Sequence, residues 1–172
     1  YEVTTVVTVK AATGQASHYY SQPFYAVTGT LTVSAPLVEN SADSNIAKLV
    51  KTGPGTMTLT AANTYTDTTT VSAGTLAFVG GSQASPITVS SGASLGFTLG
   101  SPTTSTSSVN LTNGTVKITG TVDNVSSYTL ITATGGIIGN AVIKDGDAAI
   151  SSVNIIPTQA AYEDLTAAHV VL

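Results

Sequence analysis

One short pattern recurs through the middle of the chain and restricts what the chain can fold into. It consists of a strand-like run, two small residues, a glycine and a second strand-like run. The clearest copy is TTVSAGTLAF at 69–78, and weaker copies lie at 87–95 and 109–118. Two further glycines fit the second half of the pattern alone. The glycines, 18 to 26 residues apart, are Gly29, Gly55, Gly74, Gly92 and Gly114. This spacing is typical of the successive turns of a β-solenoid.

A glycine is needed in such a pattern where the backbone has a positive φ, or where it approaches the neighbouring turn too closely for a side chain. We therefore predict structural turns at Gly55, Gly74, Gly92 and Gly114. A hairpin would explain any one of them, but a series in matching context favours a repeat. The pattern predicts a parallel β-helix, with a β-sandwich or jelly roll as the alternative.

The composition agrees with an all-β fold and narrows the classes of partner. Hydrophobic residues make up 42% of the 172 residues and charged residues only 8%, against roughly 25% in ordinary soluble domains. Thr and Ser fill the polar positions, and Thr favours strands. The net charge is −4 and every basic residue is Lys, so nucleic-acid binding is not expected. Cysteine is absent, and no apolar run is long enough to span a membrane.

The sequence pattern near both ends of the chain differs from that of the middle, which predicts three parts. Residues 1–27 hold a single predicted strand, 1–10, followed by an aromatic linker or cap. Residues 28–127 are predicted to form the β-helix turns, and residues 128–172 a closing β segment. The aromatic cluster of the first part consists of Tyr19, Tyr20, Phe24 and Tyr25. Two interpretations stay open for it: a cap over one end of the helix, or a contact between subunits.

Three segments near the start of the second part resemble the autotransporter-associated β-strand repeat. They are GPGTMTL at 53–59, NTYT at 63–66 and TTVSAGTL at 69–76. Two glycines of the family pattern are replaced by Ala61 and Asp67, so we expect that corner to have a different shape. The resemblance implies a right-handed parallel β-helix that is secreted to the bacterial cell surface. It implies no catalytic residues, because the repeat serves as scaffold.

No arrangement typical of an active site or a metal site is found in the sequence. His18 and His169 lie near opposite ends, and neither has a local partner at the ligand spacing of zinc sites. The carboxylates between residues 51 and 127 are Asp67 and Asp123, too far apart in sequence to suggest a glycosidase pair. We expect no enzyme activity, no cofactor and no metal. Asn63 is instead expected to join an internal polar ladder.

The sequence therefore predicts an extracellular structural protein, a subunit of a self-assembling surface filament or matrix. The strand at 1–10 could complete the sheet of a neighbouring copy. The predicted assembly residues are Val3, Val7 and Val9 with the four aromatics at 19–25. The alternative is an adhesin passenger segment that binds a glycan or a cell-surface protein.

Overall fold

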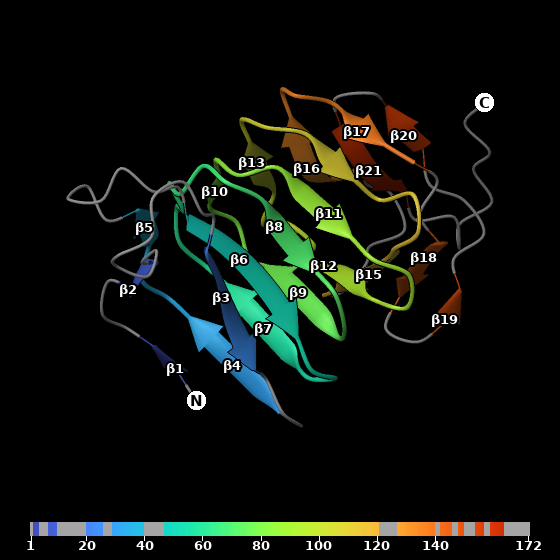
Figure 1. Cartoon of the computed structure of the whole chain (residues 1–172). Coiled ribbons are helices and arrows are strands. Elements are labelled where there is room, and N and C mark those ends of the chain that lie inside the picture. The colour runs from blue at the N-terminus through green and yellow to red at the C-terminus, as the bar shows by residue number, and fades with distance from the viewer. Residues whose placement is uncertain are drawn as a thin grey trace.

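The computed structural model describes a stack of parallel β-strands. The structure describes residues 29–39, 47–120 and 127–139. It also describes seven short strand segments outside these ranges: 2–3, 7–9, 20–25, 142–145, 148–149, 154–156 and 159–163. All regular elements among them are strands, and no helix in this part of the chain is long and apolar enough to cross a membrane. The strands lie in chain order from the blue β1 and β4 to the orange β17 and β18 (Figure 1).

Most turns of the chain add one strand segment to each of three faces. Face 1 is an eight-stranded sheet. In sheet order, its strands are β1 (Glu2–Val3), β4 (Thr30–Val33), β7 (Thr56–Leu59), β9 (Thr75–Phe78), β12 (Ser94–Thr98), β15 (Thr115–Thr119), β18 (Val142–Asp145) and β19 (Ala148–Ala149).

Face 2 combines a two-stranded and a five-stranded sheet, joined by residues 63–64. The amide of Thr64 donates to Leu37 O at 2.9 Å, and the amide of Asn63 donates to Ser82 O at 2.8 Å. In order, the strands are β2 (Val7–Val9), β5 (Leu37–Glu39), β10 (Ser82–Gln83), β13 (Thr103–Ser105), β16 (Ser127–Ala133), β21 (Gln159–Glu163) and β20 (Asn154–Ile156).

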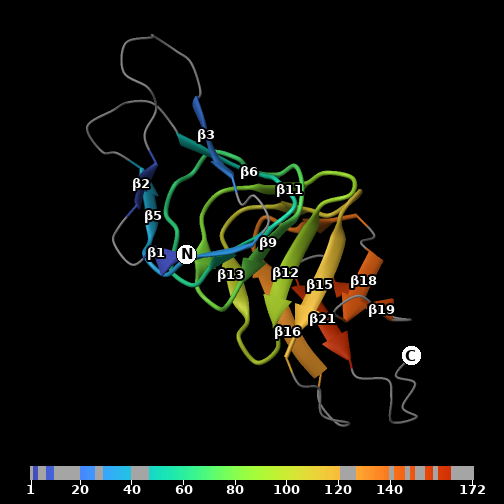
Figure 2. The same cartoon turned by 90° about the horizontal axis from the view of Figure 1, so that it is seen from below.

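Face 3 is a six-stranded parallel sheet. From the N-terminal end, its strands are β3 (Tyr20–Tyr25), β6 (Ala47–Thr52), β8 (Thr69–Val71), β11 (Ile87–Val89), β14 (Val109–Asn110) and β17 (Ile137–Ile138). Seen from below, the chain winds from face to face around a closed interior (Figure 2).

The register is regular where the sequence pattern is clearest. Thr56 lies opposite Thr75, Thr75 opposite Ser94, and Ser94 opposite Thr115. The prediction of a parallel β-helix is therefore confirmed. A β-sandwich or jelly roll is excluded for these strands, because such folds are built from antiparallel strands.

The N-terminal segment differs from the single strand predicted over 1–10. The structure has two short strands there, β1 on face 1 and β2 on face 2. Both pair in parallel with the next turn of the same chain, but in two different sheets. High strand propensity alone gives no sign of which face of a solenoid a strand joins.

The core lies inside the three faces and is apolar against face 1. Alternate residues of parallel strands point inward and stack on the same position of the next turn. Phe78 and Phe97 stack in this way, with ring centroids 6.1 Å apart and planes inclined by 27°. The two buried columns of face 1 are Met57, Leu76, Leu95 and Val116, and Leu59, Phe78, Phe97 and Ile118.

Candidate functional site

The predicted assembly residues lie on the edge strands of the N-terminal end. Val3 is opposite Val33, Val7 is opposite Leu37, and Val9 is opposite Glu39, each within the same chain. On β3, Tyr20, Phe24 and Tyr25 are opposite Ala47, Lys51 and Thr52. Tyr19 lies outside the described residues. The structure thus brings these backbone positions to one end of the stack.

The two ends of the stack are built differently. At the N-terminal end, β1, β2 and β3 all run parallel to their neighbours and end their sheets. At the other end, β19 pairs antiparallel with β18, and β21 pairs antiparallel with β16. At this end, β19 on face 1 and β21 on face 2 therefore run opposite to the strands before them. The described N-terminal end has no such reversal, and edge strands of this kind offer unpaired backbone groups to another chain.

One of the three N-terminal edges carries a proline. Pro23 lies in the middle of β3, opposite Val50. Proline has no backbone N–H to donate, and within sheets it is confined largely to edge strands. A further strand would therefore pair more readily with β1 or β2 than with β3.

Two of the predicted turn glycines have a structural requirement that can be stated in distances. Gly74 has a φ of 66°, and a Cβ there would lie 2.4 Å from both Gly53 O and Gly55 O. Gly114 faces a different obstacle, because a Cβ would lie 2.5 Å from Cγ1 of Val89 in the preceding turn. Gly92 has a positive φ of 79° with open space around it, and Gly55 is not among the positive-φ glycines.

Lys51 lies inside the solenoid, a position that the sequence reasoning missed. It is fully buried and is opposite Val71, which is in turn opposite Val89. Its Nζ donates to the carbonyl oxygens of Thr52 and Gly53 at 2.7 and 2.9 Å. A third bond, at 3.1 Å, reaches Ala73 O in the next turn.

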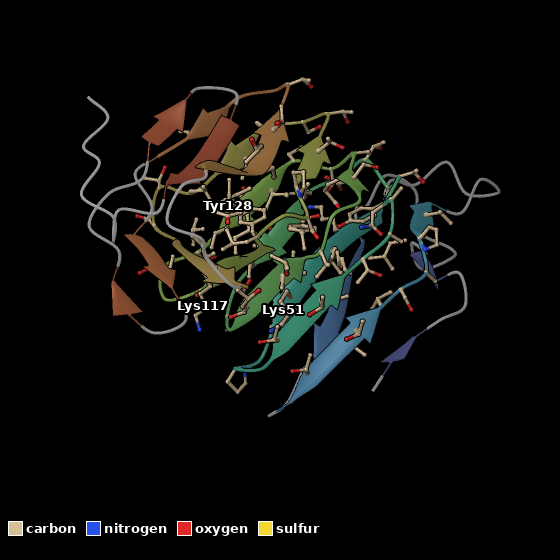
Figure 3. All side chains as sticks on the ribbon, turned by 180° about the vertical axis from the view of Figure 1, so that it is seen from behind. Lys51, Lys117 and Tyr128 are labelled. Atoms are coloured by element: carbon tan, nitrogen blue, oxygen red, sulfur yellow. The ribbon has the colours of Figure 1, made fainter. Side chains whose placement is uncertain are left out.

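The environment of the Lys51 ammonium is polar although it is closed to solvent. Burial lowers the pKa of Lys51 below its ordinary value of 10.5. Figure 3 labels the residue on β6, beside the corner where the chain turns toward β7. Its signal in the sequence is the alternation itself: LVK at 49–51 aligns with TTV at 69–71 and ITV at 87–89.

A second buried polar group lies against face 2. The hydroxyls of Tyr65 and Thr69 share a hydrogen bond, as do those of Thr69 and Ser85. Nε2 of Gln83 donates to Ser85 Oγ at 2.6 Å, while its buried Oε1 has no hydrogen-bond partner. Burial raises the pKa of Tyr65 above 10.0, and its hydrogen bonds to Thr69, Ser85 and Gln83 oppose that rise.

Asn63 lies inside the solenoid on the N-terminal side of this polar group, and its side chain bonds backbone atoms rather than the polar side chains of the predicted ladder. It is 1% exposed and pairs in parallel with Gln83, which is opposite Ser105. Its Oδ1 accepts the Leu37 amide at 2.9 Å, and its Nδ2 donates to Ala61 O at 3.2 Å. A short amide side chain thus supplies the strand pairing that a turn without a regular strand would lack.

The described part of the chain carries few charged side chains, and Lys51 among them is buried. Where side chains are described (29–38, 48–120 and 128–139), the charged residues are Lys48, Lys51, Asp67 and Lys117. Figure 3 shows the Lys117 side chain directed away from the ribbon. Within these residues, no group of three or more His, Cys, Asp or Glu could hold a metal ion. His18, Asp123 and His169 lie outside the described residues.

The buried groups described above do not form a catalytic arrangement. Lys51 and Tyr65 are both closed to solvent and bonded to neighbours in the fold. Such groups orient the backbone, whereas a general acid or base must reach a substrate. Among the described residues, β1, β2 and β3 end their sheets at the N-terminal end of the stack.

Comparison with protein families gives one match. Residues 49–78 match the family model described as passenger-associated-transport-repeat. The match spans β6 to β9, the part of the chain that contains Lys51, Asn63, Tyr65 and Gly74. The resemblance to an autotransporter passenger repeat is therefore confirmed, and it indicates a passenger-like protein that is secreted or exposed at the bacterial surface. Neither the curated proteins nor the solved structures give a significant match.

Proposed function

We propose that the chain is a non-enzymatic scaffold at the bacterial surface, whose copies associate through the N-terminal edge strands into a filament or matrix. The observation that carries this proposal is the asymmetry of the two ends. Three parallel edges lie at the N-terminal end, while β19 and β21 reverse the strand direction at the other.

Strand exchange is the association mode that these edges fit best. β1 and β2 are two and three residues long, and each pairs with only one neighbour in the described part. The same pairs, Val3 with Val33 and Val7 with Leu37, would form equally well between two copies. Exchange replaces the contacts within one chain by identical ones between chains, so it costs little free energy beyond association itself.

The charge distribution adds a condition on assembly. Acidic residues outnumber lysines both before residue 48 and after residue 139. Contacts that bring two ends together therefore place like charges near each other. At physiological ionic strength, salt largely screens such repulsion beyond about 8 to 10 Å, and more salt shortens this distance. Assembly through the ends should increase with salt.

The test is removal of residues 1–10, followed by size-exclusion chromatography and negative-stain imaging. We expect the full chain to form rods of uniform width, and the shortened chain to remain a folded monomer. Lys117→Ala, which changes the outer side of β15, is the control that should leave the rods intact. Filaments that persist after the deletion would reject strand exchange. A monodisperse full-length monomer that binds glycans or a cell-surface protein would favour the adhesin alternative.

A further inference from the structure

The corner that follows β6 is built around a positive charge, whereas the equivalent positions of later turns are apolar. We call residues 51–55 together with 73–74 the Lys51 corner. In the inward column of face 3, Lys51 is followed by Val71 and then Val89. A valine side chain has no hydrogen-bond donor, so these later turns cannot use the carbonyls of their corners in the same way.

All three N–H donors of the Lys51 ammonium bond to carbonyl oxygens of the corner. A lysine ammonium has three N–H donors and no acceptor. Its three partners are the carbonyl oxygens of Thr52, Gly53 and Ala73, at 2.7, 2.9 and 3.1 Å. Thr52 and Gly53 lie at the corner that follows β6, and Ala73 lies at the corner that follows β8. One cation thus joins two successive turns of the solenoid.

The backbone around the ammonium is packed tightly enough to be preformed. Gly53 O and Gly55 O approach Gly74 so closely that any Cβ there would lie 2.4 Å from each. The amide of Ser72 donates to Lys51 O at 2.9 Å, and the amide of Thr75 donates to Gly55 O at 3.1 Å. These bonds hold the two turns against each other on both sides of the ammonium.

We propose that the Lys51 corner is a binding site for a primary ammonium group, which the chain fills with its own Lys51. The site recognises a cation that carries three N–H donors, because its acceptors are three converging neutral carbonyls. Filling it joins the turn after β6 to the turn after β8. This inference concerns the scaffold itself, and it holds whether or not the copies assemble.

The first experiment empties the site and refills it from solution. Lys51→Ala removes the atoms that n-propylammonium would replace. We expect the variant to have a lower thermal unfolding midpoint than the wild type. Added n-propylammonium chloride should raise that midpoint in a saturable way, because a ligand that binds only the folded state stabilises it. Tetramethylammonium chloride at equal ionic strength is the control, since it has the charge but no N–H donor.

Three outcomes of that experiment would overturn the proposal. One is a Lys51→Ala variant with the same unfolding midpoint as the wild type. The others are an equal rise of the variant's midpoint in both salts, and an equal rise of the wild-type and variant midpoints in n-propylammonium, because either would show a general salt effect.

A second variant keeps the test decisive if Lys51→Ala does not fold. Lys51→Met retains the length of the side chain but removes the donors, and Lys117→Met is its matched control on the outer surface. In Lys51→Met we expect faster hydrogen exchange at the amide of Ser72, which bonds Lys51 O, and unchanged exchange at the amide of Ala93, which bonds Ser90 O. Unchanged exchange at Ser72 would reject the proposal. An unfolded Lys51→Met beside a folded Lys117→Met would support it.

Discussion

The interior of the solenoid has an apolar side and a polar side. Against face 1, the inward columns hold leucine, phenylalanine, methionine, valine and isoleucine. Against face 2, the buried residues of the middle turns are polar (Asn63, Gln83, Ser85, Thr103 and Ser105), and apolar residues such as Leu37, Ile131 and Ala133 lie in the turns on either side. Apolar burial is non-directional and tolerates changes of shape. Buried polar groups are costly without partners, so they fix which turn stacks on which. One side mainly supplies stability, and the other mainly supplies register.

The largest effect is expected at the Lys51 corner, which connects face 3 to the apolar face 1. Gly74→Ala should lower the free energy of unfolding by more than about 4 kcal/mol, because its Cβ would collide with two backbone carbonyls as well as strain a positive φ. Gly92→Ala is the matched control, with a positive φ but open space. It should cost about 1 to 2 kcal/mol. Urea unfolding measures both, and equal losses would contradict the steric argument.

Phe97→Ala tests the apolar side. Phe97 is 1% exposed and stacks on Phe78, so truncation leaves a cavity in the middle of the face 1 column. We expect a loss of about 3 to 4 kcal/mol in urea unfolding. Phe97→Leu should cost less than about 1.5 kcal/mol, because it largely conserves the volume. A similar loss in both variants would show that this side is as specific in shape as the polar side.

Tyr65→Phe tests the polar side with the smallest change in shape. Loss of the hydroxyl removes its bond to Thr69, and we expect a cost of about 1 to 2 kcal/mol at neutral pH. The folded pKa of Tyr65 is raised above the unfolded value near 10.0, so the folded chain holds this proton to higher pH. The stabilisation from Tyr65 is therefore complete below pH 10 and decreases as the pH rises above 10.

The readout for this prediction is the difference between the two chains, measured by urea unfolding at neutral pH and above pH 10. The two chains differ only in the Tyr65 hydroxyl, so the difference between them reports on Tyr65. It should shrink above pH 10. A difference that grows or stays constant would mean that burial does not raise the pKa of Tyr65.

Much of the fold follows from the sequence, because glycine spacing and alternation report directly on turn length and on the inward side. The positive φ of Gly74 and Gly92 and the interior place of Asn63 belong to this part. The buried Lys51 was not predicted, since lysine is rarely buried and the carbonyls that hold it come from two turns. The division of the predicted strand at 1–10 between β1 on face 1 and β2 on face 2 was missed for a related reason. Strand propensity describes single residues, whereas the face that a strand joins depends on the neighbouring turn.

The short separation between stacked strands has a consequence for how the chain reaches its folded state. Thr56, Thr75 and Ser94 occupy the same position in consecutive turns, only 19 residues apart at each step. Each segment therefore needs only the segment just before it in the chain as a template. In such an array, folding nucleates locally and propagates between neighbours. A chain built in this way can fold progressively, one turn after another, before its last segments are available.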